Sequence, residues 1–271
     1  MRMELQTKVE IRRSAWTIEP RHRLFFVGSC FAENIGRRFA DSQFRVVVNP
    51  FGVMYNPASI FHTVQRYEGD VPDVAVLTLG TNHVYVLKET GEIVDNCQKR
   101  PQILFDEQEL SVEQCAGYLR QAIQMLVEQN PDVHVVLTVS PIRYRKYGYH
   151  GSQLSKSTLL LAAHQLVQAM PERVTYFDAY ELMNDELRDY RFYREDMLHP
   201  SEQAVSYIWQ RFGETFFSKA TIDFIEEWRP IGQALAHRPF HADTSEYQAF
   251  LEKAQERAKA FRKKYGLQEI L

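Results

Sequence analysis

The sequence has little cysteine and no long apolar run. Among its 271 residues are only 3 cysteines, at positions 30, 97 and 115. An odd number at these spacings predicts neither a disulfide framework nor a zinc site, and it is typical of a reducing compartment. No run approaches the ~20 apolar residues that cross a bilayer, and residues 1–8 lack the apolar stretch of a signal peptide. We therefore predict a cytoplasmic protein that does not engage a membrane.

An excess of charge of one sign is also missing. The 32 Lys and Arg residues nearly balance 35 Asp and Glu residues, which leaves a formal net charge of -3. This balance provides no basic field for a nucleic-acid backbone, so we predict no nucleic-acid partner. The acidic residues near the 9 histidines form no evident ligand set, so we predict neither a metal site nor a cofactor.

Short apolar runs alternate with longer amphipathic ones along most of the chain. This alternation is typical of strands and helices around a mainly parallel sheet. The expected strands are residues 24–27, 44–48, 74–79, 133–139 and 174–177. The expected helices are residues 32–40, 57–67, 112–129, 157–170 and 203–217. We predict a three-layer α/β/α domain with a mainly parallel five-stranded sheet.

Two further segments complete the predicted organisation. Residues 83–94 have the pattern of a hairpin inserted after the third strand, where it could form one wall of a cleft. Near residue 218 the composition changes: Trp228-Arg229-Pro230 is expected to break the chain, and residues 243–265 to form a charged helix that ends at Gly266. We predict a main domain over residues 1–217 and a C-terminal helical extension over residues 218–271.

A serine follows the first expected strand, in Val27-Gly28-Ser29-Cys30. The carboxyl ends of strands are where open α/β folds collect ligands, and the next helix directs free amides at the same point. Ser29 is therefore either a turn and helix cap or a nucleophile. We expect Cys30 to be a small packed residue, because its side chain points away from that of its neighbour.

A second motif, Asp196-Met197-Leu198-His199-Pro200, lies just before the last helix of the main domain. An Asp three residues before a His on a turn can hold the imidazole Nδ1-H, which leaves Nε2 free to accept a proton. The same spacing also occurs in helix caps. A nucleophile after the first strand, with its base and orienting carboxylate in the last loop, has the order that a serine hydrolase needs.

Several stretches together resemble the GSCFA family, which is related to the SGNH (GDSL-like) hydrolases. They are residues 28–36, 49–57, 79–81, 96–99, 139–143 and 196–201. The resemblance implies an SGNH-like hydrolase domain over residues 1–217 that cleaves ester bonds without a cofactor. It assigns Ser29 as nucleophile, His199 as base and Asp196 as the residue that orients the base.

The resemblance also implies an oxyanion hole made of the Ser29 amide, the Gly52 amide and the Asn82 side chain. Three donors aimed at one oxygen stabilise the tetrahedral intermediate of acyl transfer. Asn96 is the alternative to Asn82 if its loop folds inward, although a turn asparagine that satisfies backbone groups is the other interpretation. The first motif reads Gly-Ser-Cys where the superfamily usually has Gly-Asp-Ser, so the aspartate before the serine is missing.

Basic and aromatic residues gather in the loop 140–155, including Arg143 and Tyr144. With His83, these two side chains are expected at the substrate rim, where they could stack a sugar or bind an acidic group. The predicted substrate is an ester of a small molecule or carbohydrate, for example an O-acetyl group. An O-acyltransferase and a non-catalytic ligand-binding or scaffold protein that retains the fold are the alternatives, and the oligomeric state stays open.

Overall fold

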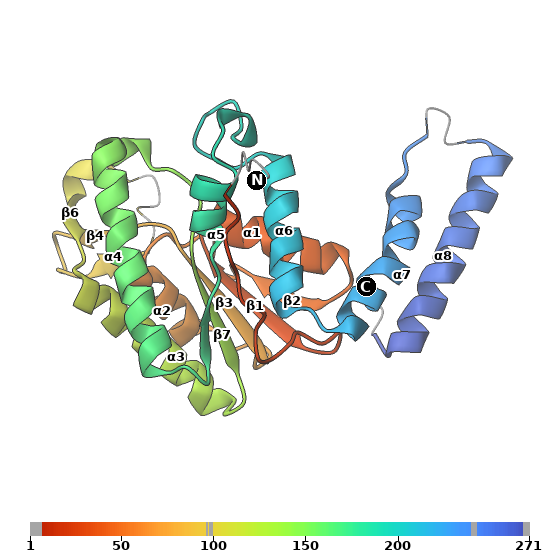
Figure 1. The fold of residues 1–271 in the computed structure, drawn as a ribbon, viewed down its shortest axis with the longest axis horizontal. Coiled ribbons are helices and arrows are strands. Elements are labelled where there is room, and N and C mark those ends of the chain that lie inside the picture. The colour runs from red at the N-terminus through yellow and green to blue at the C-terminus, as the bar shows by residue number, and fades with distance from the viewer. Residues whose placement is uncertain (1–6, 96, 98–99, 240–242, 268–271) are drawn as a thin grey trace, which may run out of the picture.

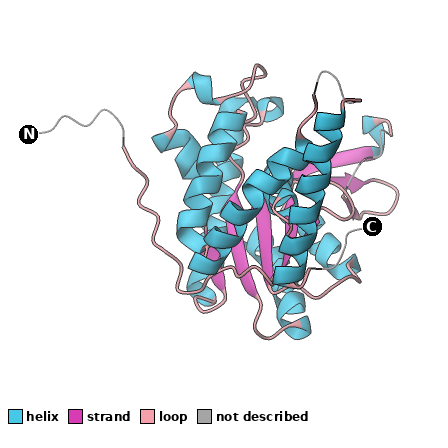
Figure 2. Cartoon of the chain, turned by 90° about the vertical axis from the view of Figure 1, so that its right-hand side faces the viewer, coloured by secondary structure: helices cyan, strands magenta, loops and turns pink. Residues whose placement is uncertain are grey.

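The computed structural model describes residues 7–95, 97, 100–239 and 243–267. The strands at its centre form one sheet with helices packed on it (Figure 2). This sheet has five strands in the order β2-β1-β3-β7-β8, and every pairing in it is parallel. The strands are β1 (Arg23–Gly28), β2 (Arg45–Val48), β3 (Val74–Leu79), β7 (His134–Val139) and β8 (Val174–Tyr176). All five lie where the apolar runs predict them.

Helices cover both faces of this sheet (Figure 1). The described part of the chain has the helices α1 (Cys30–Asp41), α2 (Pro57–Arg66), α3 (Val112–Gln129), α4 (Gly148–Ala169), α5 (Ala179–Glu181), α6 (Glu202–Phe216), α7 (Lys219–Ala236) and α8 (Ser245–Tyr265). Single turns of tighter or wider helix lie at Gln102–Leu104, Arg145–Tyr147, Leu182–Glu186 and Tyr190–Phe192. The predicted three-layer α/β/α class is confirmed, as are helices after the main domain.

Strand side chains alternate between two hydrophobic cores. In β1, Phe25 and Val27 pack with residues of α2, α3 and α4, whereas Leu24 and Phe26 pack with residues of α1 and α6. Burial on both faces is the reason that these strands are continuous apolar runs in the sequence. Both cores end where the strands end, so the polar residues that follow β1, β3 and β7 meet at one edge of the sheet.

A second, antiparallel sheet in the order β5-β4-β6 lies beside this edge. Its strands are β4 (His83–Leu87), β5 (Ile93–Val94) and β6 (Phe105–Glu109). The predicted hairpin over residues 83–94 is confirmed by the pairing of β4 with β5. The sequence does not predict β6, because its last four residues are polar and exposed and only the pairing with β4 makes it a strand.

One predicted helix begins nine residues too late. Residues 148–156 belong to α4 in the structure, not to the loop 140–155 expected from their polar composition. Ser152 accepts a hydrogen bond from the Tyr144 amide, and Ser155 contacts both the Thr81 hydroxyl and the Asn82 amide. The helix thus buries a polar face, which hydrophobic periodicity cannot reveal.

The expectation that Trp228-Arg229-Pro230 breaks the chain is wrong. Helix α7 continues through Pro230. The Trp228 indole donates to the Asp41 carbonyl at 2.6 Å and packs on Phe261 of α8. These tertiary contacts offset the cost of a proline inside a helix.

Helices α7 and α8 form an antiparallel pair at one end of the molecule (Figure 1). Helix α8 begins after the cap residue Thr244 and ends at Gly266, which has a left-handed φ of 64°, as predicted. Phe224 of α7 and Phe261 of α8 belong to the same core as Phe44, so this pair is packed on the main domain. The division of the chain at residue 218 stays a prediction.

The N-terminal segment is held against the start of α7. Ile18 donates its amide to the Phe216 carbonyl at 2.7 Å, and its own carbonyl accepts the Thr221 hydroxyl at 2.6 Å. Ile18 itself is fully buried. Residues about 200 positions apart are therefore joined at the base of the fold. Within the described part of the chain, no helix has the length and apolar character needed to span a membrane.

Candidate active site

Ser29 lies directly after β1, at the N-terminus of α1. Its hydroxyl accepts a hydrogen bond from the Phe31 amide at 3.2 Å, so it caps the helix, and the residue is fully buried. Gly28 before it has a φ of +146°, and an added Cβ there would lie 2.2 Å from the Thr78 carbonyl oxygen. Only glycine allows β1 to approach β3 so closely and turn at once into the helix.

The Ser29 hydroxyl donates to the Ser140 hydroxyl at 3.0 Å. Ser140 follows β7, and β1 and β7 flank β3. Counted from the row Gly28, Thr78 and Thr138, Ser29 lies one residue further along its strand and Ser140 two, so both serines lie at the same edge of the sheet. No role for Ser140 was predicted from the sequence. The signal was present, because a polar residue at the carboxyl end of a neighbouring strand belongs to the same edge.

Asp196 and His199 form a compact turn before α6. The Asp196 carboxylate accepts the amides of Leu198 at 2.8 Å and His199 at 2.9 Å with one oxygen, and its other oxygen lies 2.6 Å from His199 Nδ1. Backbone hydrogen bonds from His199 and Leu198, with a smaller contribution from the His199 ring, lower the pKa of Asp196 to about 2. The carboxylate is therefore ionised and contacts the ring at Nδ1, an arrangement that can leave Nε2 free to accept a proton.

Four residues connect this turn to the serines. The segment begins with Ser140, which contacts Ser29, and ends with Arg143, which contacts the turn. The Arg143 amide donates to the Leu198 carbonyl at 3.1 Å, and its guanidinium donates to the Met197 carbonyl at 3.2 Å. The Cα atoms of Ser140 and Arg143, three residues apart in the chain, are separated by at most about 11 Å. Among the described residues no hydrogen bond joins Ser29 to His199, and none occupies His199 Nε2.

The three predicted oxyanion donors already have acceptors. The Ser29 amide donates to the Thr78 carbonyl at 3.3 Å and the Gly52 amide to the Asn49 carbonyl at 2.9 Å. The Asn82 side chain donates to the Leu110 carbonyl at 2.8 Å. That bond uses one of the two N–H groups of the Asn82 amide. Asn96, the alternative donor, lies outside the described residues.

Asn49 is a further polar residue near Ser29 that the sequence analysis did not single out. Its side-chain oxygen accepts the Gly28 amide at 2.9 Å, whereas its Nδ2 is buried and has no partner among the described residues. Asn49 also has a left-handed φ of 44°, which is uncommon outside glycine. Asn49 is the first residue of the motif 49–57, which was the available signal.

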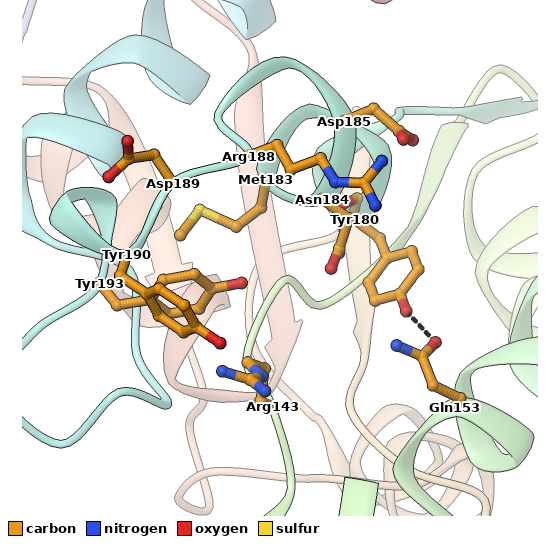
Figure 3. Close-up of a pocket in the computed structure, with 10 residues that line it drawn as sticks. All are labelled: Arg143, Gln153, Tyr180, Met183, Asn184, Asp185, Arg188, Asp189, Tyr190 and Tyr193. Atoms are coloured by element: carbon orange, nitrogen blue, oxygen red, sulfur yellow. Dashed lines mark hydrogen bonds between the residues drawn. The ribbon is translucent and has the colours of Figure 1, made fainter. Parts of the chain in front are cut away.

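The predicted rim residues line two different cavities. Arg143 lines a cavity of about 550 Å³. Its guanidinium lies over the rings of Tyr149 and Tyr193, at 4.4 and 5.5 Å from their centroids. Figure 3 shows Arg143, Tyr180, Tyr190 and Tyr193 around this space, with Tyr180 hydrogen-bonded to Gln153.

His83 and Tyr144 line a second cavity of about 300 Å³ together with Tyr55, on the side of β4. The rings of His83 and Tyr147 are stacked with their centroids 3.6 Å apart. Burial lowers the pKa of His83. Burial raises the pKa of Tyr144 well above its usual value, and the buried Tyr144 hydroxyl has no partner among the described residues. The predicted rim is therefore divided between two sides of the site.

No group of three or more His, Cys, Asp or Glu side chains arranged to hold a metal ion occurs in the described ranges. Cys30 packs against the core, with its sulfur 4.0 Å from the Tyr55 hydroxyl.

The sequence model of the GSCFA family matches residues 23–72 and 70–212. A model of the C-terminal domain of GSCFA proteins matches residues 228–269. The motif resemblance is thus confirmed over most of the chain. Comparison with curated proteins finds no match.

Solved structures with a similar fold are distant. A carbohydrate esterase of family 3 from Talaromyces cellulolyticus is 12% identical with a TM-score of 0.42, and the match covers 76% of this chain and 99% of that one. A catalytic variant of an acetylxylan esterase from Geobacillus stearothermophilus is 13% identical with a TM-score of 0.47, and the match covers 74% of this chain and 97% of that one. A protein described as a GDSL-like lipase from Parabacteroides merdae is 13% identical with a TM-score of 0.48, and the match covers 72% of this chain and 97% of that one. Likenesses this distant leave the substrate of this chain open.

Proposed function

The chain belongs to the GSCFA family, and from that premise we propose that it is a serine-dependent hydrolase of ester bonds. The observation that carries the proposal is the connection between its two motifs. Asp196 holds His199 with Nε2 unoccupied by any described residue, and the segment from Ser140 to Arg143 hydrogen-bonds both that turn and Ser29. Nucleophile, base and orienting carboxylate thus share one hydrogen-bonded framework.

In the proposed reaction, Ser29 Oγ attacks the ester carbonyl while His199 Nε2 takes its proton. The imidazolium then gives that proton to the leaving alkoxide, and an acyl-enzyme remains on Ser29. Water, activated by the same imidazole, releases the acid and restores the serine. For this step the Ser29 O–H must point to His199 instead of Ser140, and the Ser140 hydroxyl can then donate to Ser29 Oγ and keep that oxygen in place.

The proposed oxyanion hole keeps the Ser29 amide, the Gly52 amide and the Asn82 side chain as donors. Asn82 has a second N–H beyond the one that contacts Leu110, and the Ser29 amide makes the longest of the three present contacts. The Asn82 side chain can therefore donate to a substrate oxygen while it keeps the Leu110 contact, and the Ser29 amide would exchange its long contact for one to the substrate. The Gly52 amide lies in a tight turn and would need a shared hydrogen bond.

For the substrate we propose an ester of a carbohydrate or other small polar molecule. The cavity beside Arg143 is lined by tyrosine rings together with charged side chains, Arg188 and Asp185 among them. Ring faces bind the apolar faces of sugars, and the fixed donors and acceptors bind their hydroxyl groups. The volume of about 550 Å³ is within the range of small-ligand sites.

Labelling with a fluorophosphonate, followed by peptide mapping, tests the proposal. The expected result is modification of Ser29 that is absent in Ser29→Ala and strongly slowed in His199→Ala, with hydrolysis of short-chain aryl esters lost in parallel. A label on Cys30 would overturn the serine assignment. A folded protein that neither labels nor hydrolyses would favour the non-catalytic binding protein, which the occupied oxyanion donors support, and acyl transfer to an added alcohol would favour the transferase.

A further inference from the structure

A lysine is buried directly behind the serines. Lys156 lies on α4 and is only 2% exposed. Its Nζ donates to the Gly80 carbonyl at 2.7 Å and to the Ser140 carbonyl at 2.8 Å. These two carbonyls follow the last residues of β3 and β7. One side chain thus joins the ends of the two strands that carry the Asn82 loop and Ser140.

No carboxylate in the described ranges pairs with this lysine. Its Nζ lies over the rings of Tyr144 and Tyr180, at 5.0 and 5.9 Å from their centroids. Burial lowers the pKa of the ammonium group to about 7. An amine buried without a counter-ion weakens a fold compared with an apolar side chain of similar volume. Packing alone therefore does not account for a lysine at this position.

Ser140 connects the lysine to the nucleophile. Its carbonyl accepts from Lys156, and its hydroxyl accepts from Ser29. The neighbouring Ser155 contacts the Thr81 hydroxyl and the Asn82 amide, each at 3.0 Å. The first half of α4 therefore fixes the position of Ser140 and of the loop that follows β3.

We propose that Lys156 is a positioning residue of the serine site: it holds the Gly80 and Ser140 carbonyls together and so places the Ser140 hydroxyl against Ser29. This role rests on the proposed function of Ser29 as nucleophile. The amine donates hydrogen bonds in both of its protonation states, and Lys156 itself touches neither substrate nor the reacting atoms.

The first experiment compares steady-state kinetics of Lys156→Met with those of the wild type on a short-chain aryl ester. We expect kcat to fall about 10-fold or more while KM changes little, because displaced catalytic groups lose rate rather than ground-state binding. Lys156→Gln, which keeps an N–H donor, is expected to recover part of the rate. Lys219→Met is the matched control, since Lys219 is an exposed lysine of α7. Unchanged kcat in folded Lys156→Met would overturn the proposal.

A double-mutant cycle separates positioning through Ser140 from a general loss of stability. Ser140→Ala alone is expected to lower kcat, and adding Lys156→Met to it is expected to cost much less than Lys156→Met costs alone. If the two substitutions lower kcat by factors that simply multiply in the double variant, Lys156 does not act through the Ser140 hydroxyl.

Crystal structures of the wild type and of Lys156→Met give a readout that does not need activity. The expected result is loss of the contact between the Ser29 and Ser140 hydroxyls in the variant. An unchanged contact overturns the positioning role even if the enzyme is active. If wild-type Ser29 neither labels nor hydrolyses, the proposed function fails, and the two structures still decide whether Lys156 places Ser140.

Discussion

The hydroxyl of Ser29 donates a hydrogen bond to the hydroxyl of Ser140, across the end of the strand that separates them. The contact holds the proposed nucleophile in a defined rotamer inside the protein. It also directs the proton of Ser29 toward Ser140, whereas the proposed chemistry needs that proton on His199.

Asp196→Asn is expected to lower kcat by about 10²-fold or more without unfolding the protein. The amide keeps the size of the carboxylate, but it can present an N–H to His199 Nδ1 and so favour the wrong tautomer. Because the pKa of Asp196 is about 2, the wild-type carboxylate stays ionised throughout any practical assay. The acid limb of the pH–rate profile must therefore come from another group, and a variant with full activity would contradict the assigned role.

Arg143→Met is expected to lower kcat about 10-fold while the melting temperature changes little. The guanidinium supports the turn through the Met197 carbonyl, and its removal lets His199 move relative to Ser29. Arg191→Met is the control, because Arg191 is exposed and pairs with Asp189 at the surface. An equal fall of kcat in the two variants would show that losing a positive charge, rather than losing the contact with Met197, lowers the rate.

Gly28→Ala is expected to destabilise the protein by about 2 kcal/mol or more, measured by urea denaturation. The new Cβ would lie 2.2 Å from the Thr78 carbonyl oxygen, and the φ of +146° strains any L side chain. Gly117→Ala on α3 is the matched substitution, because nothing lies within 4 Å of its new Cβ. That variant is expected to gain about 0.5–1 kcal/mol, since alanine favours helix.

The stability of the wild type is expected to depend on the protonation of Lys156. Its pKa is lowered from 10.5 to about 7 in the folded protein. Between these values the unfolded chain binds a proton that the folded chain has released, so this group makes stability rise with pH. The rise is at most about 1.4 kcal/mol per pH unit, and below pH 7 the contribution is constant.

Urea unfolding of the wild type and of Lys156→Met from pH 6 to pH 10 measures this effect. The free energy of unfolding of the variant, relative to that of the wild type, is expected to be greatest at pH 6 and to decline toward pH 10. A difference that does not vary with pH would show that Lys156 keeps its ordinary pKa in the fold.

The sequence predicted the fold where burial leaves a pattern. The five central strands are apolar runs because both of their faces are covered, and the capping box at Ser111 marks the first residue of α3 as the structure has it. The start of α4 and the strand β6 were missed, because hydrogen bonds to distant residues form them rather than hydrophobic periodicity. The effect of Pro230 was also mispredicted, because its helix is held by the packing of Trp228 on Phe261, 33 positions after Trp228.

Of the candidate site, the contact between Asp196 and His199 could be predicted from the sequence, whereas the residues that support Ser29 could not. Motif spacing identified Asp196 with His199, whose contact is local and can be read from three residues. Ser140 and Lys156 were not assigned roles, because their importance lies in contacts with Ser29 and Gly80, more than 70 positions away. No spacing rule covers such pairs in a single sequence.

The pairing of Ile18 with Phe216 and Thr221 has a consequence for how the chain folds. These contacts close a loop of about 200 residues, and loop closure must be completed before the contacts give any stabilisation. Contacts of such long range slow folding. We expect the segment around Ile18 to dock in the last and slowest phase of refolding, after the central sheet has formed.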